Sequence, residues 1–529
     1  MTPHPLPARP NLEQLKKQAK SLLRAAQRRD AGAIQRCAAL PAFASRPADQ
    51  ISSAIALHDA QSVIAREHGF ASWAAMREEV EERTLSFDAA VDEFVRCATG
   101  GASGRAERLL ALHPGIASST FHTALVLGDA TSVDARLREH PGLATVSGGP
   151  QDWEPLLYVC HTSLHRTVPA RVDGLVRIAR ALLALGANPN AEYHWNWHPE
   201  LPRTALWGSV CAVRHLPLAE VLLEAGANPT DGVTTHIAGG GGDIAALELL
   251  ARHGLEMNGI PGGVPPLVYM MQWADNPAGP FWLLDHRADA NLAWGDEGEA
   301  PLHVAARRWN VAMIARLVEH GADPMRRRAD GATAHTLAER YGNHDIGSWL
   351  LAHGAIDELS PLDRFLAACA RADRAAAEAM LAARPDLARD LRAEHHLMLQ
   401  RHAESGNIAA LETMLACGFD PNVRDKDNVT ALHRSAMTGS VEATRVLLAA
   451  RADLAALDGM FAAPPIVWAV EGRTHARPGA DHVAVARLLI AAGSPVTWTP
   501  PAGAPDPERT LDGLSDLVRA ATGSADAGA

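Results

Sequence analysis

The chain has 529 residues, more than one ordinary globular core holds, so several domains or one elongated repeat array are expected. Nearly half of the residues are apolar, but Tyr and Phe are scarce, which favours small helices packed closely together. The formal charge of −12 argues against general nucleic-acid binding, because neutralising phosphates requires a basic surface.

Residues 1–10 are rich in proline and are expected to be loose. From Asn11, a residue able to cap a helix, leucine and alanine recur on one helical face through residue 23. Helical patterns continue to residue 83, with Ser72 as a candidate cap for the last helix. Residues 11–84 therefore predict an α-helical N-terminal module.

Residues 86–147 predict two degenerate repeats, each a pair of short helices that ends in His-Pro. Clearer turns follow, and those at Gly254, Arg287, Gly321 and Gly354 are 33, 34 and 33 residues apart by subtraction. Two steps are longer by roughly one loop insertion each. The pattern predicts about twelve repeats within residues 86–496.

Residues 497–529 are rich in Pro, Gly, Ala and Asp and are predicted to be mostly disordered, apart from a short helix at 509–521. A second insertion, residues 471–481, lengthens the turn between the helices of the last repeat. It is interpreted as a surface loop, with capping of the stack or contact with a partner as alternatives.

The repeat is clearest in residues 300–325, APLHVAARRWNVAMIARLVEHGADPM, where apolar residues at helical spacing come twice before Gly321. Pro301-Leu302-His303 followed by Gly321-Ala322-Asp323-Pro324 resembles the ankyrin repeat, whose period is about 33 residues. Thr430-Ala431-Leu432-His433 repeats the frame. The resemblance implies an all-α ankyrin-repeat solenoid, and the helical N-terminal module is similar to leaders of some bacterial ankyrin-repeat proteins.

The same resemblance gives most histidines a structural interpretation. In ankyrin repeats a histidine after the Pro-Leu pair bonds backbone groups of a neighbouring turn, which implies this role for His236, His303 and His433. His335 stands one place earlier in its copy, so its role is open. The glycine run 239–242 superficially resembles a phosphate-binding loop, but the repeat frame places Gly242 at the turn between two helices.

Metal binding and catalysis find little support in the sequence. His161 and His165 are four residues apart, as are His194 and His198, but no cysteine or clear carboxylate completes a ligand set. Catalytic signatures such as GxSxG and HExxH are absent from the sequence. We therefore predict no metal, no cofactor and no enzymatic activity.

Tryptophan is the most informative residue type, because seven of the twelve fall between residues 195 and 309. An insertion at residues 190–203 lies between two repeats and carries two of them. Large aromatic side chains are typical anchors of protein interfaces. The resemblance implies protein–protein interaction through the concave face, with these candidates: His194, Trp195, Trp197, His198, Trp207, His236, Tyr269, Trp273 and Trp309.

The alternative is a small-molecule pocket, with or without catalysis, where the inserted segment folds over the first helices near His161, His194, His198 and His236. A scaffolding role for the N-terminal module and the tail is the third alternative.

Six cysteines lie far apart without a CxxC pair, which predicts buried thiols in a reducing compartment. The sequence has no apolar run of membrane-spanning length, so we expect a cytoplasmic protein that does not contact membranes.

Overall fold

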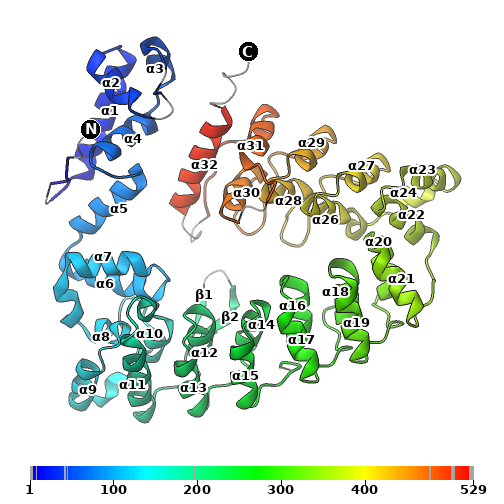
Figure 1. Cartoon of the computed structure of the whole chain (residues 1–529), viewed down its shortest axis with the longest axis horizontal. Helices are drawn as coiled ribbons and strands as arrows, with labels where there is room; N and C mark the ends of the chain where they lie inside the picture. The colour runs from blue at the N-terminus through cyan, green and yellow to red at the C-terminus, as the bar shows by residue number, and fades with distance from the viewer. Residues whose placement is uncertain are drawn as a thin grey trace. The chain divides into compact units, whose positions relative to one another are not determined.

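The computed structural model describes residues 4–7, 9–40, 43–44, 46–195, 198–260, 263–475, 478–501 and 507–522. It divides into two compact units: the first comprises Met1–Ala238 and Ala245–Leu255, and the second Gly239–Ile244 and Glu256–Ala529. Figure 1 shows each as a succession of short helices joined by turns. The strands among the described residues form one hairpin, so the predicted all-α class is confirmed.

Residues 11–84 form five helices with an apolar core of their own: α1 (Leu12–Gln27), α2 (Ala31–Ala38), α3 (Ala48–Ala54), α4 (Leu57–Glu67) and α5 (Trp73–Thr84). The Asn11 side chain caps α1 by accepting a hydrogen bond from the Gln14 N–H at 3.0 Å, and Ser72 caps α5 in the same way. Residues 4–7 of the preceding stretch, expected to be loose, lie against this core. Leu6 is buried in it, and the His4 N–H donates to the Glu67 carbonyl at 2.8 Å. Burial of the Leu6 side chain contributes to holding this segment in place.

Twelve helix pairs follow among the described residues, which confirms the predicted number of repeats. The first five are α6 (Phe87–Thr99) and α7 (Ser103–Leu112), α8 (Phe121–Leu127) and α9 (Ala130–Glu139), α10 (Pro155–His161) and α11 (Arg171–Ala184), α12 (Ala205–Trp207) and α13 (Leu216–Glu224), and, at the boundary between the units, α14 (Thr234–Gly240) and α15 (Ile244–Arg252).

The second unit contains the other seven pairs. They are α16 (Pro266–Trp273) and α17 (Ala278–Asp285), α18 (Pro301–Arg308) and α19 (Val311–Glu319), α20 (Ala334–Arg340) and α21 (His344–Ala352), α22 (Pro361–Ala370) and α23 (Arg374–Ala383), α26 (Met398–Ser405) and α27 (Ile408–Ala416), α28 (Ala431–Thr438) and α29 (Val441–Ala449), and α30 (Pro465–Gly472) and α31 (His482–Ala491). Shorter helical segments are η1 (Pro114–Ser118), η2 (Pro141–Ala144), η3 (Leu164–Arg166), η4 (Gly208–Ala212), α24 (Asp386–Arg389), α25 (Ala393–His396) and η5 (Arg473–His475).

Like helices pack on like helices within each unit. In the second unit α16 contacts α18 and α18 contacts α20, while α17 contacts α19 and α19 contacts α21 (Figure 1). Leu302 in α18 and Ile314 in α19 are buried between the layers. One pair is too small to bury its own apolar faces, so stacking supplies the core.

The turns that end the pairs adopt the left-handed conformation expected from the sequence. Gly321 has φ of 87°, and Arg287 and Arg451 take the same conformation with φ of 67° and 64°. A side chain at such a position strains the backbone, so the two arginines remain there at some cost in stability.

The insertion at residues 190–203 carries an antiparallel hairpin of β1 (Glu192–Trp195) and β2 (His198–Thr204). Glu192 pairs with Thr204 and Tyr193 with Arg203. In the second insertion, residues 471–481, η5 extends α30, and residues 476–477 lie outside the described part of the chain.

The C-terminal segment contains α32 (Pro507–Thr522), where the sequence allowed a helix at 509–521. It packs against α30 and α31 and buries Leu514 and Leu517. The Arg487 guanidinium donates to the Ala521 carbonyl at 3.1 Å. Helix α32 therefore covers apolar side chains of the pair α30 and α31.

Two histidines of the repeats, His303 and His433, bond backbone groups on both sides of the ring. Backbone N–H groups of Ala300 and Thr430 donate to Nδ1 of His303 and His433 at 3.1 and 3.2 Å. The opposite ring nitrogens lie 2.9 and 3.1 Å from carbonyls of the next turn. These contacts confirm the structural roles of both histidines. His335 is buried, and its Nδ1 has no hydrogen-bond partner among the described residues.

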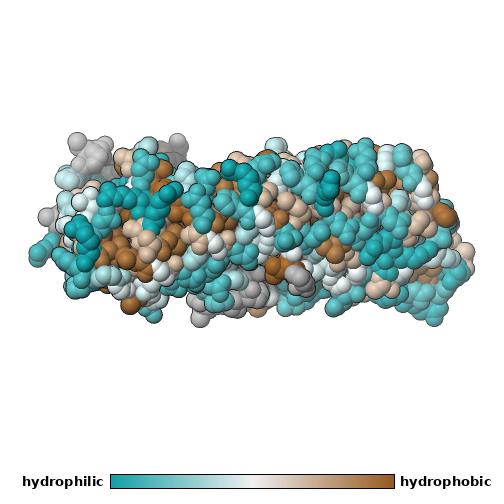
Figure 2. Space-filling model, turned by 90° about the horizontal axis from the view of Figure 1, so that it is seen from below, coloured by the Kyte–Doolittle hydropathy of each residue, from teal (hydrophilic) through white to brown (hydrophobic). Residues whose placement is uncertain are grey.

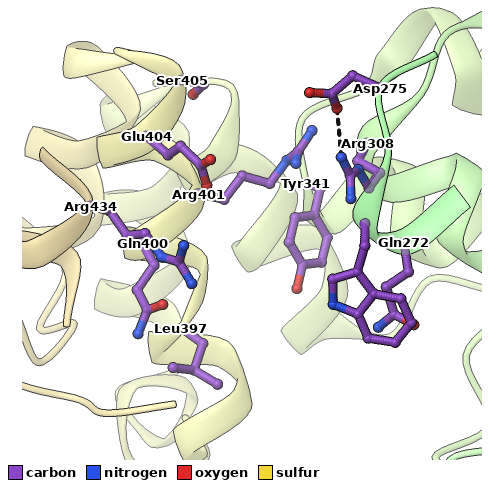
Figure 3. Close-up of a pocket in the computed structure, with 11 residues that line it drawn as sticks. Gln272, Asp275, Arg308, Tyr341, Leu397, Gln400, Arg401, Glu404, Ser405 and Arg434 are labelled. Atoms are coloured by element: carbon purple, nitrogen blue, oxygen red, sulfur yellow. Dashed lines mark hydrogen bonds and ion pairs between the residues drawn. The ribbon is translucent and has the colours of Figure 1, made fainter. Parts of the chain in front are cut away.

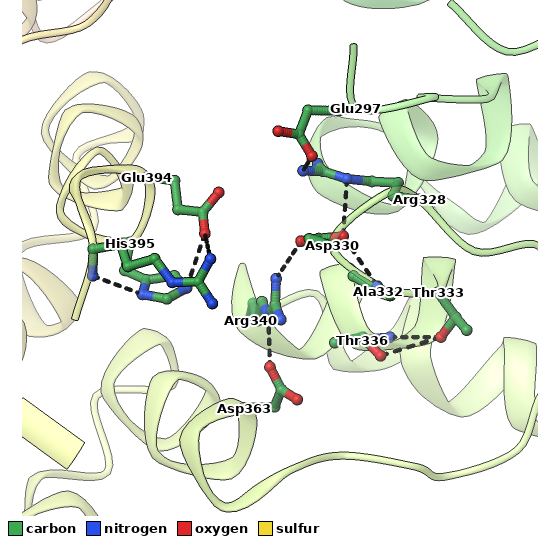
Figure 4. Close-up of polar contacts among 12 residues, drawn as sticks. Glu297, Arg328, Asp330, Ala332, Thr333, Thr336, Arg340, Asp363, Glu394 and His395 are labelled. Atoms are coloured by element: carbon green, nitrogen blue, oxygen red, sulfur yellow. Dashed lines mark hydrogen bonds and ion pairs between the residues drawn. The ribbon is translucent and has the colours of Figure 1, made fainter. Parts of the chain in front are cut away.

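A chain of ion pairs crosses the turns between α18, α20 and α22 (Figure 4). Arg328 contacts carboxylates of Glu297, Glu299 and Asp330 at 3.1–3.4 Å. Arg340 then joins Asp330 at 3.3 Å to Asp363 at 2.6 Å. Each buried charge in this ion-pair network has an opposite partner. The network therefore holds the turns together without leaving one of its own charges unpaired.

The cysteines are mainly buried and are unpaired, as the sequence analysis predicted. Five of the six cysteines are buried, Cys211 is half-buried, and all are free.

The face shown in Figure 2 is mainly hydrophilic, with small scattered apolar patches. Of the helices in the described ranges, none combines the length and apolar character needed to cross a membrane.

Candidate binding surface

Three of the predicted aromatic residues lie together in the second unit. Trp273 ends α16 with half of its surface exposed, and Tyr269 contacts its ring at a centroid distance of 4.8 Å. Trp309 follows α18, and its indole N–H donates to the Met271 carbonyl at 2.7 Å. Trp309 therefore ties two neighbouring pairs together, whereas Trp273 leaves a large ring face open.

The other candidates belong to the first unit. His194 is exposed on β1, with Nε2 3.8 Å from the Glu192 carboxylate. Trp195 and His198 occupy the hairpin backbone, but their side chains, and all of Trp197, lie outside the described part. Trp207 is half-buried beneath the Arg203 guanidinium, 4.2 Å from the ring centroid, and His236 is buried in α14.

Tyr193 of the hairpin joins an aromatic cluster in the first unit. Its ring stacks on Trp153 at 4.3 Å, and His161 lies 5.3 Å from Tyr193 and 5.9 Å from Trp207. His161 Nδ1 donates to the Leu157 carbonyl at 2.9 Å, and burial lowers the pKa of His161 to about 4. Its Nε2 is thus an unprotonated acceptor, and neither it nor the Trp207 indole N–H has a partner among the described residues.

His161 and His165 do not belong to a metal site among the described residues, and the side chain of His198 lies outside the described part of the chain. His161 ends α10, whereas His165 lies in η3, where its Nδ1 contacts the Thr162 carbonyl at 3.1 Å. The described residues hold no group of three or more His, Cys, Asp or Glu placed for a metal ion.

In the glycine run 239–242, Gly242 has φ of 75° and precedes α15, which confirms its assignment to the turn between two helices.

A cavity of about 630 Å³ opens beside Trp273 in the second unit (Figure 3). Arg308 and Tyr341, from α18 and the end of α20, form one side, and Trp273 of α16 also lines the cavity. Gln400, Arg401 and Arg434, from α26 and α28, form the other. The cavity therefore combines two aromatic rings with three guanidinium groups on the first-helix side of the stack.

The three arginines differ in how their charge is balanced. Arg308 donates to the Asp275 carboxylate at 2.7 Å, and Arg434 reaches Asp425 at 3.4 Å. Arg401 is half-buried, and its guanidinium forms no hydrogen bond or ion pair with any described residue. Burial, followed by repulsion from Arg308, lowers the pKa of Arg401. An anion in the cavity would relieve both effects.

Our sequence analysis did not find these arginines, although the repeat frame contains a signal. Leu432-His433-Arg434 aligns with Leu399-Gln400-Arg401, so consecutive pairs place arginine at the same point of the first helix. Gln400 also replaces the histidine in function, because its Nε2 donates to the Val429 carbonyl at 2.7 Å. An alignment of repeats by this polar residue would have predicted adjacent guanidiniums.

Comparison with known proteins agrees with this architecture. The family models for ankyrin repeats in three copies and in many copies match residues 267–360 and 399–448. The mouse 2-5A-dependent ribonuclease is 43% identical over 56 residues, covering 11% of this chain and 8% of the relative. The Caenorhabditis elegans ankyrin repeat and KH domain-containing protein mask-1 is 26% identical over 174 residues, covering 32% of this chain and 6% of the relative.

The chain thus spans less than a tenth of either curated relative. Among solved structures, the human ASB11 ankyrin repeat domain aligns at 24% identity with a TM-score of 0.33, covering 45% of this chain and 99% of that one. The repeat models match segments of the second unit whose helix pairs and turns have the predicted frame. The second unit of the chain therefore contains ankyrin repeats.

Proposed function

We propose that the chain binds another protein, without catalysis, through the first-helix face of its second unit. The observation that carries this proposal is the half-exposed Trp273 at the edge of a cavity. A large, rigid aromatic ring provides much contact area and loses little conformational entropy on binding. Ankyrin repeats commonly serve protein–protein interaction, which supports the same function.

The surrounding structure supports Trp273 as a preformed anchor. Tyr269 contacts its ring, and the Trp309 indole holds the neighbouring helix pair in place. A surface fixed by its own packing avoids much of the ordering cost of association. The exposed ring can therefore contribute its contact area to the partner.

The hairpin of the first unit is a second proposed contact region. It carries Trp195 and Trp197, with His194 and His198 beside them. If these tryptophans contact the partner, replacing both with alanine will reduce capture while leaving helicity and thermal unfolding unchanged. Full capture by that double variant would remove the hairpin from the interface.

The anchor is tested by affinity capture followed by quantitative mass spectrometry with the full chain and Trp273→Ala. Trp349→Ala is the matched control, because Trp349 lies on the second helix α21 and stacks on His353 at 3.7 Å. We expect specific partners to be retained by the parent and the control but reduced about tenfold or more by Trp273→Ala. Equal recovery by all three proteins would contradict the proposed anchor.

A second candidate function is small-molecule binding at the aromatic cluster of the first unit. It is favoured by the buried His161 Nε2 and Trp207 N–H, an acceptor and a donor without partners among the described residues. A small ligand with the complementary groups would satisfy both. Native mass spectrometry of the purified chain tests this, with a bound mass that disappears in Trp207→Phe as the supporting result.

A further inference from the structure

We propose that the second-unit cavity receives an acidic side chain of the bound protein, with Arg401 as its principal contact. This inference rests on the proposed function and specifies the chemistry of the partner. It concerns the cavity lined by Trp273, Arg308, Tyr341, Gln400, Arg401 and Arg434.

The balance of charge around Arg401 is the first argument. Other largely buried guanidiniums of the second unit are matched by carboxylates: Arg328 contacts three, and Arg340 contacts two. Arg401 is half-buried and forms no such contact with the described residues. Because an unpaired charge withdrawn from water is costly, its surroundings favour an anion supplied from outside.

The carboxylates near the cavity do not take this role. Asp275 is engaged by Arg308 at 2.7 Å, and Asp425 by Arg434 at 3.4 Å. Glu404 lies on the same helix as Arg401 and lines the cavity, but no ion pair joins them. A carboxylate entering the cavity would therefore meet a guanidinium that is still free to form a charge-assisted hydrogen bond.

The rings in the cavity favour a protein segment as the carrier of that carboxylate. Tyr341 lies across the cavity from Arg434 (Figure 3), and Trp273 also lines the cavity. A volume of about 630 Å³ accommodates an acidic side chain together with an apolar neighbour. An acidic residue beside an apolar one thus fits both the charge and the surface of the site.

The test is selection of peptides from a random displayed library on the full-length chain. The parent, Arg401→Gln and Arg401→Lys are compared with Arg445→Gln, which removes an exposed arginine from the second helix α29. We expect the parent and the control to enrich Asp or Glu beside an apolar residue. Arg401→Gln should lose that preference, and Arg401→Lys should retain part of it because it keeps the charge.

Affinities of one selected peptide and its Glu→Gln form then give a double-mutant cycle. We expect Arg401→Gln to weaken the acidic peptide about tenfold and to change the neutral one by less than about twofold. Peptides selected without acidic enrichment, or acidic enrichment that survives Arg401→Gln, would overturn the inference while leaving protein binding intact. Failure of every chain to select peptides would instead count against the proposed function. Thermal unfolding of each variant separates loss of contact from loss of fold.

Discussion

At the scale of single residues, equivalent positions in the repeats use different side chains to make the same bond. His303 and His433 reach a carbonyl of the next turn through an imidazole nitrogen, and Gln400 reaches it through an amide. The amide has no titrating group, so the exchange keeps the bond but removes its dependence on pH.

Mild acid is therefore expected to destabilise the repeats through their buried histidines. Burial lowers the pKa of His303 and His433, whereas an unfolded histidine has a pKa of about 6.5. Below about pH 6.5 the unfolded chain takes up protons that the folded chain resists, so the free energy of unfolding falls as pH falls. We predict that His433→Gln unfolds with a smaller difference in urea midpoint between about pH 7.5 and pH 5 than the parent. An unchanged difference would show that His433 does not contribute to the acid sensitivity.

The sequence predicts which residue types form the site better than it predicts their exposure. Trp207, Trp273 and Trp309 all lie in or next to the first helix of a pair, yet of the three only Trp273 exposes half of its surface. The difference comes from partners distant in sequence, such as Met271 for Trp309. Arg401 and Arg308 meet in one cavity for the same reason, since the intervening pairs bring α18 and α26 to its two sides.

At the scale of elements, asparagines couple one turn to the next. Asn291 donates to the Gly321 carbonyl at 2.7 Å and accepts from the Asp323 N–H at 2.8 Å. Asn422 makes the same two contacts with Arg451 and Asp453, at 3.3 and 2.7 Å. The side-chain amide has both a donor and an acceptor, which is why asparagine suits this position.

Removing this bridge is expected to loosen the interface between two pairs without changing either core. Asn291→Ala loses both hydrogen bonds, and we predict a destabilisation of about 1–2 kcal/mol in urea unfolding. Asn291→Asp is the matched variant, because it keeps the acceptor for the Asp323 N–H but loses the donor to Gly321. It should fall between the parent and Asn291→Ala, and equal stability of all three would refute the coupling.

Helix pairs were predictable because their apolar spacing and turn glycines repeat with one period. The hairpin and the position of α32 were not, because each depends on contacts outside that period. The hairpin is positioned by Tyr193, which stacks on Trp153. Helix α32 is positioned by packing on α30 and α31, which buries Leu517. The insertions themselves are visible in the sequence. The position that an inserted or appended element takes can be found only from its packing in the structure.

At the scale of the whole molecule, separate cores predict separate responses to damage. The N-terminal module has its own apolar cluster, which includes Leu22, and the last pairs share another, which includes Leu432. In repeat proteins stability is approximately a sum of local terms and nearest-neighbour interfaces. Loss of one core contact should therefore spread to adjacent pairs and weaken with distance along the chain.

Native-state hydrogen exchange can test this at the resolution of peptides. Leu432→Ala removes a fully buried side chain, at an expected cost of about 2–5 kcal/mol. Protection should fall in α28 and in α26, α29, α30 and α31, which pack against it, and remain at the parent level in α1 to α5. Leu22→Ala should produce the opposite pattern, because Leu22 belongs to the core of the N-terminal module. An equal loss of protection along the chain in both variants would contradict this prediction. It would mean that the cores unfold as one cooperative unit, because a substitution in one core would then lower protection in both.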